Sequence, residues 1–182
     1  MENRVVSGPD GERPVRHDGP VAEAFTEPFP EVPRIAASAG ALIRDEAGRV
    51  LIQKPSYKGA WTIPGGQIQP DDESPWEACQ RETFEECGLR IEQGRLACVD
   101  FLRSKPTRPS GVRFLFDCGA MTAEQLSAIT LDGQEIIAHQ FAELIEALEL
   151  LSGPIRRRVA AVAGQKHCVY LEEGRPLSAV TP

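Results

Sequence analysis

Three glutamates at helical spacing are the residues of this sequence best suited to chemistry. Glu82, Glu85 and Glu86 occupy positions i, i+3 and i+4, so in a helix their carboxylates share a face within an arc of about 100°. Carboxylates this close repel one another unless a cation lies among them, and hard divalent ions prefer carboxylate oxygens. The same spacing also occurs on solvated helix faces, where Arg81 would supply the neutralising charge. The spacing alone leaves both interpretations open.

The segment that carries these glutamates is predicted to be a helix from Pro75 to Cys87. Ser74 is a suitable N-cap, Pro75 takes the first helical position, and Glu77 completes a capping box. Gly88 is expected to end the helix in the left-handed conformation. The apolar stripe of this helix is predicted to consist of Trp76, Cys79, Thr83 and Cys87.

A glycine-rich segment precedes the helix. Trp61-Thr62-Ile63 is predicted to be a short strand, and Pro64-Gly65-Gly66 a tight turn after it. Because glycine has no side chain, such a turn lets the backbone approach a ligand closely, and its carbonyls could join the same metal. The glycines therefore favour a metal site over a solvated acidic face.

Together these residues resemble the Nudix box, whose pattern is G-x5-E-x7-R-E-U-x-E-E-x-G-U, with U an apolar residue. The matching positions are Gly66, Glu73, Arg81, Glu82, Glu85, Glu86, Gly88 and Leu89. The sequence departs from the pattern at two points. Six residues rather than five separate Gly66 from Glu73, with the extra residue within 69–72, and Thr83 stands where an aliphatic residue is usual. Neither departure removes a carboxylate.

The resemblance implies a fold and a reaction. The fold would be an α+β (α/β/α) sandwich around a mixed sheet. The reaction would be hydrolysis of the pyrophosphate bond of a nucleoside diphosphate linked to another group, such as a nucleoside triphosphate, an ADP-sugar or a dinucleotide. Water would attack phosphorus with Mg²⁺, or Mn²⁺, as the cofactor. The alternative is a Nudix-fold module that senses nucleotides without turnover, against which the intact glutamates argue.

The resemblance also implies residue roles. The implied metal ligands are Glu82, Glu85, Glu86 and the carbonyl of Gly65. Arg81 would orient the glutamates through ion pairs, and Glu73 would support them near the helix start. The general base would be Glu86 or Glu85, or else Glu135 ahead of a later strand. Glu135 could equally be an exposed charge at a strand edge.

Side chains for substrate contact are expected mainly around a basic, proline-containing loop. The predicted residues are Trp61, Arg103, Lys105, Arg108 and Arg113. The basic side chains could bind phosphate or a sugar, and the tryptophan could stack on a base. Solvated basic residues and core packing of the tryptophan are the alternatives that the sequence leaves open.

The chain is expected to divide into three parts. Residues 1–33 contain six prolines and are predicted to be an extended or mobile arm, because they gain too little burial to offset ordering entropy. Residues 34–153 would form the Nudix domain, and 154–182 a C-terminal helix and short strand. The other predicted strands are 34–44, 49–54, 96–102, 112–118 and 135–141, and the other predicted helices follow Thr122 and cover 142–151 and 155–162.

Composition narrows the class of protein further. A chain of 182 residues can bury a hydrophobic core, and its net charge of −7 argues against non-specific nucleic-acid binding. No apolar run is long enough to span a membrane, and no secretory signal is visible. Five cysteines without a C-x-x-C pair suit a reducing compartment, so we expect a cytoplasmic protein. The expected partner is a small nucleotide substrate, and the proline-rich arm could serve a homodimer.

Overall fold

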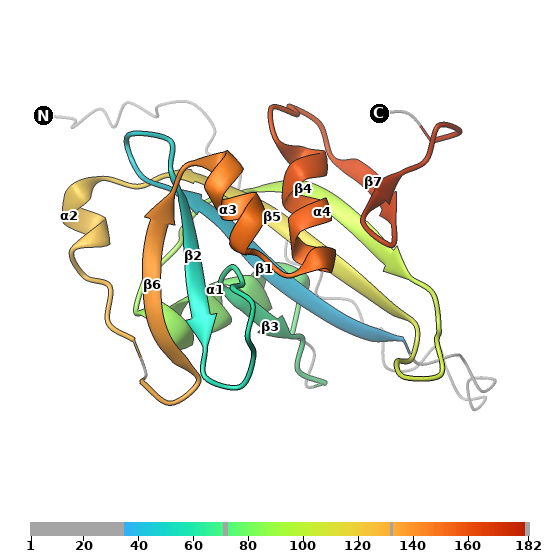
Figure 1. Ribbon diagram of the computed structural model, residues 1–182, viewed down its shortest axis with the longest axis horizontal. Helices are drawn as coiled ribbons and strands as arrows, with labels where there is room; N and C mark the ends of the chain where they lie inside the picture. The colour runs from blue at the N-terminus through green and yellow to red at the C-terminus, as the bar shows by residue number, and fades with distance from the viewer. Residues whose placement is uncertain (1–34, 71–72, 132, 181–182) are drawn as a thin grey trace, which may run out of the picture. The chain divides into compact units, whose positions relative to one another are not determined.

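The computed structural model describes residues 35–70, 73–131 and 133–180 (Figure 1). The predicted arm over 1–33 lies outside the described residues, as do positions 71 and 72 within the predicted insertion.

Strands and helices alternate along the chain in mixed order. The strands are β1 (Ala36–Arg44), β2 (Val50–Pro55), β3 (Gly65–Gln67), β4 (Arg95–Leu102), β5 (Gly111–Ala120), β6 (Ile136–Ala142), β7 (Val169–Glu172) and β8 (Arg175–Pro176). The helices are α1 (Pro75–Cys87), α2 (Ala123–Leu126), α3 (Leu144–Leu150) and α4 (Gly153–Val162). The mixed α+β class is therefore confirmed.

The strands form one mixed sheet in the order β6-β2-β1-β5-β4-β7-β8, and β3 pairs with β1 beside this path. β1 runs parallel to β5 and antiparallel to β3, but it meets β2 only where Arg44 faces Val50. Because β2 diverges from β1, the edge of β1 is open to β3. β3 therefore lies beside β1, where it also contacts α1.

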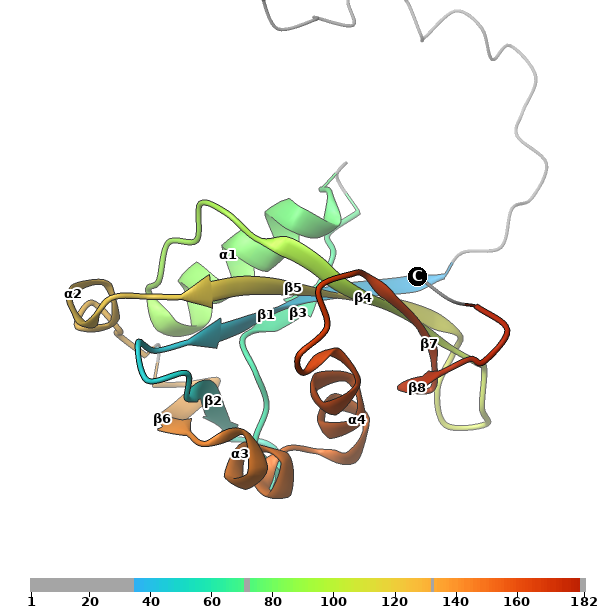
Figure 2. The same cartoon turned by 90° about the horizontal axis from the view of Figure 1, so that it is seen from above.

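Helices cover both faces of the sheet, with α1 on one face and α3 and α4 on the other (Figure 2). Successive residues of β1 point to opposite faces of the sheet, so β1 contributes side chains to the buried clusters on both faces. Ala41 and Ile43 belong to the buried cluster beneath α1, whereas Leu42 belongs to the cluster beneath α3 and α4. The sandwich architecture that the resemblance implied is thus present.

The segment before α1 differs from its prediction. Trp61 and Thr62 form only isolated bridges, and the strand begins at Gly65, inside the predicted tight turn. Gly65 has a φ of 141°, and a Cβ built on it would lie 2.4 Å from the carbonyl oxygen of Ala39. Glycine is needed here because β3 approaches β1 too closely for any side chain. The predicted turn was wrong, and the glycines serve pairing between two strands.

The C-terminal segment completes the sheet. β7 runs parallel to β4, and β8 turns back along β7 as a hairpin rather than the single short strand that was predicted. This segment belongs to the same compact unit as the rest of Ile35–Pro182. Among the described helices, none combines the length and the apolar character needed to cross a membrane.

Candidate active site

α1 begins and ends where its capping residues predicted. The Ser74 hydroxyl accepts a hydrogen bond from the Glu77 amide at 3.2 Å, and the Ser74 amide donates to Glu77 Oε2 at 2.8 Å. Gly88 closes the helix with a φ of 71°. The buried positions include the predicted stripe residues Cys79, Thr83 and Cys87. These contacts determine how the helix is rotated, and therefore where its glutamates lie.

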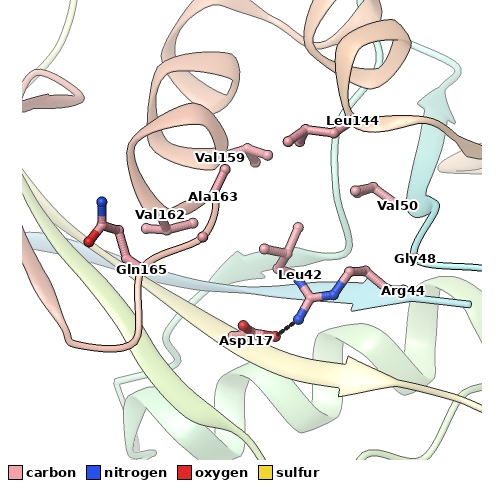
Figure 3. A pocket seen from close by; sticks show the side chains of 11 residues that line it. Leu42, Arg44, Gly48, Val50, Asp117, Leu144, Val159, Val162, Ala163 and Gln165 are labelled. Carbon is pink, nitrogen blue, oxygen red and sulfur yellow. Dashed lines mark hydrogen bonds and ion pairs between the residues drawn. The ribbon is translucent and has the colours of Figure 1, made fainter.

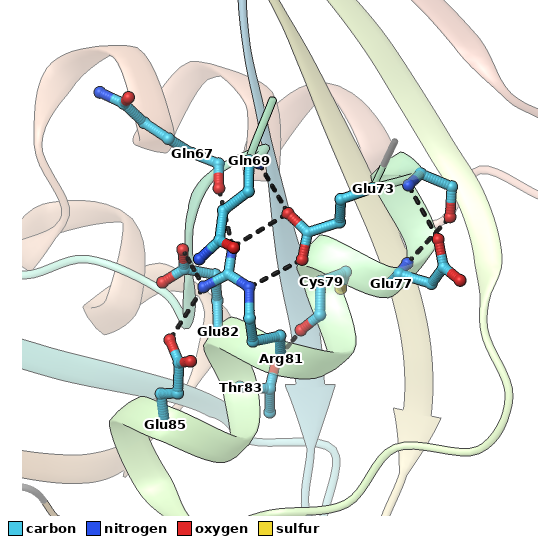
Figure 4. Close-up of polar contacts among 10 residues, drawn as sticks. Gln67, Gln69, Glu73, Glu77, Cys79, Arg81, Glu82, Thr83 and Glu85 are labelled. Carbon is cyan, nitrogen blue, oxygen red and sulfur yellow. Dashed lines mark hydrogen bonds and ion pairs between the residues drawn. The ribbon is translucent and has the colours of Figure 1, made fainter. Parts of the chain in front are cut away.

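Arg81 is the centre of a carboxylate cluster that Figure 4 shows in close-up. Its Nε donates to Glu73 Oε1 at 2.7 Å, and its Nη1 donates to both Glu82 Oε1 and Glu85 Oε2 at 2.8 Å. Its Nη2 donates to the Gln67 carbonyl at 2.9 Å. One guanidinium thus joins three acids of the predicted site to the end of β3.

The extra residue before Glu73 does not displace its carboxylate from the cluster. Both Glu73 oxygens accept from Arg81, and Oε2 also accepts from the Gln69 amide at 2.7 Å. The hydrogen bond from Arg81 contributes most to holding the pKa of Glu73 below its usual value, and the bond from the Gln69 amide contributes next. The insertion therefore leaves the register of α1 unchanged.

Glu86 and Glu82 contact the two glycines of β3. Glu86 is only 7% exposed, and its Oε2 accepts a hydrogen bond from the Gly65 amide at 2.8 Å. A Cβ built on Gly66 would lie 2.3 Å from the carboxyl carbon of Glu82, so this carboxylate occupies the space of the missing side chain. Gly65 therefore contacts a predicted ligand through its N–H group, and Gly66 makes room for another.

A fifth acid, Glu135, lies near these glutamates although it comes from a distant segment. Burial raises the pKa of Glu82, and the charges of Glu85 and Glu135 raise it further, whereas Arg81 lowers it. The Tyr57 hydroxyl donates to Glu135 Oε1 at 3.3 Å. Burial and then the charges of Glu135, Glu86 and Glu82 raise the pKa of Tyr57. The structure thus brings Glu135 to the cluster together with Tyr57, which lies in a loop and carries no sequence signal.

The chemistry of this donor set suits a hard divalent ion. Within the described residues, no group of three His, Cys, Asp or Glu side chains is arranged to hold a metal. Glu82 and Glu85 instead share one Arg81 nitrogen, so their bonded oxygens are separated by at most twice 2.8 Å. Burial first, and then the charges of Glu85 and Glu135, raise the pKa of Glu82, and a cation among these acids would offset both effects.

A pocket of about 310 Å³ adjoins this cluster. It shares Gly65 and Gly66 with the carboxylate contacts, and residues of β1, β5 and the start of α4 form other parts of its wall. The cationic lining residues are Lys58, Arg108, Arg113 and Arg158. No acid occurs among the described residues that line it. The pocket and the cluster therefore form one continuous candidate site.

The predicted substrate residues are only partly brought together. Arg108 and Arg113 line the pocket, whereas Arg103, Lys105 and Trp61 do not. Trp61 is half-buried and packs against the core cluster beneath α3 and α4. The position of Trp61 therefore agrees with core packing, the alternative to stacking on a base.

The C-terminal hairpin pairs with the basic loop between β4 and β5. Arg103 forms an ion pair with Glu172, and Glu173 binds Lys105 at 2.8 Å and Arg108 at 2.7 Å. The bonds from Lys105 and then Arg108 lower the pKa of Glu173 to about 2. Partners separated by 65 to 69 residues cannot be recognised from local spacing.

A buried ion pair beside the pocket was also missed. Asp100 of β4 is fully buried, and it accepts hydrogen bonds from Arg158 Nε at 2.7 Å and from the Gly174 amide at 2.8 Å. The pair links β4, α4 and the C-terminal hairpin. An isolated aspartate within an apolar strand gives no indication of its partner.

A second pocket, of about 360 Å³, lies between the sheet and the helices α3 and α4 (Figure 3). Leu42, Val50 and Val159 form much of its apolar wall, and Arg44 pairs with Asp117 at one end. It shares no lining residue with the carboxylate cluster or with the pocket beside β3. We therefore do not assign it to the candidate active site.

We expect Arg81→Lys to weaken the candidate site through lost geometry rather than lost charge. A lysine ammonium cannot reproduce the fork that bonds Glu73, Glu82 and Glu85 together. Loss of these charge-assisted hydrogen bonds should lower the free energy of unfolding by about 1–3 kcal/mol. Mg²⁺ should restore part of this loss, because the ion can take over neutralisation of the carboxylates. Urea denaturation with and without Mg²⁺ measures both effects.

The matched control is Arg49→Lys. Arg49 pairs with Asp45 in the turn after β1, at 2.7 Å and away from the cluster. Its substitution should change stability equally with or without Mg²⁺, because the pair with Asp45 has no part in the carboxylate cluster. The same Mg²⁺ response in both variants would show that Arg81 has no special relation to a metal.

Comparison with known proteins relates this fold and site to a family. The family model for the NUDIX domain matches residues 34–161. A MutT-like protein of Streptomyces ambofaciens is 30% identical over 122 residues, which is 63% of this chain and 75% of that protein. An RNA pyrophosphohydrolase of Pseudomonas fluorescens is 40% identical over 63 residues, 34% of this chain and 39% of that protein. The crystal structure of a MutT protein from Methanosarcina mazei Go1 superposes with a TM-score of 0.59 at 28% identity, covering 72% of this chain and 96% of that chain.

The chain therefore belongs to the Nudix family, as the box residues indicated. It is a Nudix hydrolase, a member of a class of enzymes that hydrolyse phosphoric anhydride bonds. Enzymes of this family generally use divalent metals such as Mg²⁺.

Proposed function

We propose that this hydrolase cleaves the pyrophosphate bond of a nucleoside diphosphate linked to another group, with Mg²⁺ or Mn²⁺ bound by the carboxylates of α1. One observation carries the proposal. Glu82 and Glu86 contact the same two glycines that form part of the wall of the cationic pocket. An anionic substrate in the pocket would therefore lie against the acids that can hold a divalent ion. The similarity to an RNA pyrophosphohydrolase supports hydrolysis of this type of bond.

The metal ligands in this proposal are Glu82, Glu85 and Glu86. A bound divalent ion neutralises charge that develops at phosphorus and lowers the pKa of water. Arg81 holds two of these glutamates through one nitrogen, which keeps them on the same side of α1. The Gly65 amide fixes one oxygen of Glu86.

The attacking water must lose a proton, and we assign this role to Glu86. Glu86 is nearly buried beside β3, whereas the Glu85 side chain is 55% exposed and bonded to Arg81. The water oxygen bonds to phosphorus, the bridging P–O bond opposite to it breaks, and the proton passes to the carboxylate. Glu135, which Tyr57 holds near the cluster, is the second candidate for this base.

The test is a panel of nucleoside triphosphates, ADP-sugars and dinucleotides, incubated with Mg²⁺ or Mn²⁺ and analysed for phosphate-containing products. We expect at least one compound to release a nucleoside monophosphate together with the phosphorylated remainder, and EDTA to stop the reaction. Binding of these nucleotides without any turnover would contradict the proposal. That outcome would identify a nucleotide-sensing module instead.

A further inference from the structure

The pocket beside β3 holds more positive charge than the fold neutralises. Two of its cations have carboxylate partners, since Arg158 pairs with Asp100 and Arg108 with Glu173, each at 2.7 Å. The other two, Arg113 and Lys58, form no ion pair within the described part of the chain. Lys58 Nζ lies 4.7 Å from the centre of the Tyr57 ring. Two cationic charges are thus left for a ligand.

Arg113 is the more constrained of these two cations. It lies half-buried on β5, and its Nη1 donates to the backbone carbonyls of Ala36 and Val112 at 3.0 Å. Burial lowers the pKa of Arg113, and the charges of Arg158 and Arg108 lower it further. Asp100 faces it across the strands but is already bonded to Arg158. A half-buried cation beside other cations is unfavourable unless an anion joins it.

Arg108 has an unused donor in the same pocket. Its Nη2 donates to the Arg103 carbonyl and to Glu173, but its Nε is buried without a hydrogen-bond partner among the described residues. A buried donor left unpaired is costly, so the fold leaves Arg108 incompletely bonded where it lines the pocket. The planar guanidinium group is suited to phosphate oxygens.

We propose that this pocket binds a phosphate of the substrate beyond the bond that is hydrolysed, so that nucleoside polyphosphates with at least three phosphates are preferred over nucleoside diphosphate sugars. The inference rests on the proposed function for the position of the cleaved bond. Gly65 and Gly66 belong to both the cluster and the pocket, so a phosphate chain that continues past the cluster enters the pocket. A dianionic phosphate balances Arg113 and Lys58, whereas a neutral sugar leaves both unpaired.

The experiment is calorimetric binding of adenosine mono-, di- and triphosphate in EDTA, so that no hydrolysis occurs. Affinity for the wild-type protein should rise with phosphate number, and ADP-ribose measured in the same way should bind more weakly than the triphosphate; equal or tighter binding of ADP-ribose would contradict the preference. Arg113→Gln should weaken triphosphate binding by about 10- to 100-fold and monophosphate binding much less. Arg156→Gln is the matched control, because Arg156 is an exposed arginine of α4 outside the pocket and its loss changes the net charge equally. It should bind as the wild type does.

Two further outcomes overturn the inference. One is an affinity that does not depend on phosphate number, and the other is an equal loss of mono- and triphosphate binding in Arg113→Gln. Thermal unfolding shows whether each variant is folded, and Arg113→Lys should recover part of the binding if charge is what matters. Turnover in the substrate panel combined with Arg113-independent binding would leave the proposed function standing. Arg113-dependent binding without any turnover would retain the phosphate site and reject the enzyme assignment.

Discussion

Glu86→Gln is expected to abolish hydrolysis while the fold remains intact. Glutamine has nearly the same shape, and its side-chain oxygen can still accept the hydrogen bond from the Gly65 amide, so the contact between α1 and β3 survives. The variant loses the negative charge that the proposal uses to hold a divalent ion and to accept a proton. We expect kcat to fall by at least about 10²–10⁴-fold, the range for loss of a positioned acid–base group.

The measurement is the rate of nucleotide release under saturating substrate and metal, with circular dichroism to monitor the fold. Glu92→Gln is the matched control, because Glu92 is an exposed glutamate in the loop after α1. Undiminished turnover in Glu86→Gln would remove this residue from the site. A loss of similar size in Glu135→Gln, with a changed pH dependence of kcat, would transfer the role of base to Glu135.

Gly66→Ala is expected to lower activity with little loss of stability. The new Cβ would lie 2.3 Å from the carboxyl carbon of Glu82 and 2.4 Å from both its oxygens. These atoms form the flexible end of a side chain, so the carboxylate rotates away and the backbone does not need to move. We expect kcat/KM to fall by about 10- to 100-fold, as for substitutions that reorient metal ligands.

Gly65→Ala provides the matched contrast. Its Cβ would lie 2.4 Å from the Ala39 carbonyl oxygen and 2.5 Å from the Gly40 Cα, which are backbone atoms of β1. Strain at a φ of 141° and the clash together should lower the free energy of unfolding by about 2–4 kcal/mol. Urea denaturation of both variants tests the distinction. Equal destabilisation would show that Gly66, too, is required for packing of β3.

Local patterns were sufficient to predict the helix α1. The capping box of Ser74, the terminal Gly88 and the apolar stripe each depend on residues within a few turns of one another, so α1 agrees with its prediction at both ends. The glycines before it were misinterpreted because their role depends on β1, a partner that is more than 20 residues away in sequence. Their need for close approach was recognised, but the neighbouring backbone could not be identified.

The predicted substrate residues were harder to place, because the geometry of the pocket beside β3 depends on ion pairs between residues that are distant in sequence. Arg103, Lys105, Arg108 and Arg113 appear equivalent in the sequence. The acids of the C-terminal hairpin bind the first three, and Arg113 has no such partner in the described residues. Asp100 and Arg158 likewise meet only through the packing of α4 on the sheet. Which basic residue remains for a ligand is therefore a property of the tertiary structure.

The hairpin also has a consequence for how this enzyme could diverge from its relatives. The matched family region ends at residue 161, yet Glu173 lies beyond it and holds Arg108 at the rim of the pocket. Under the proposed phosphate site, sequence change in the hairpin of β7 and β8 would alter the pocket that the substrate enters, without altering any residue of α1. The proposed phosphate site would then let two enzymes with identical Nudix boxes act on different nucleotides because their hairpins hold Arg108 differently.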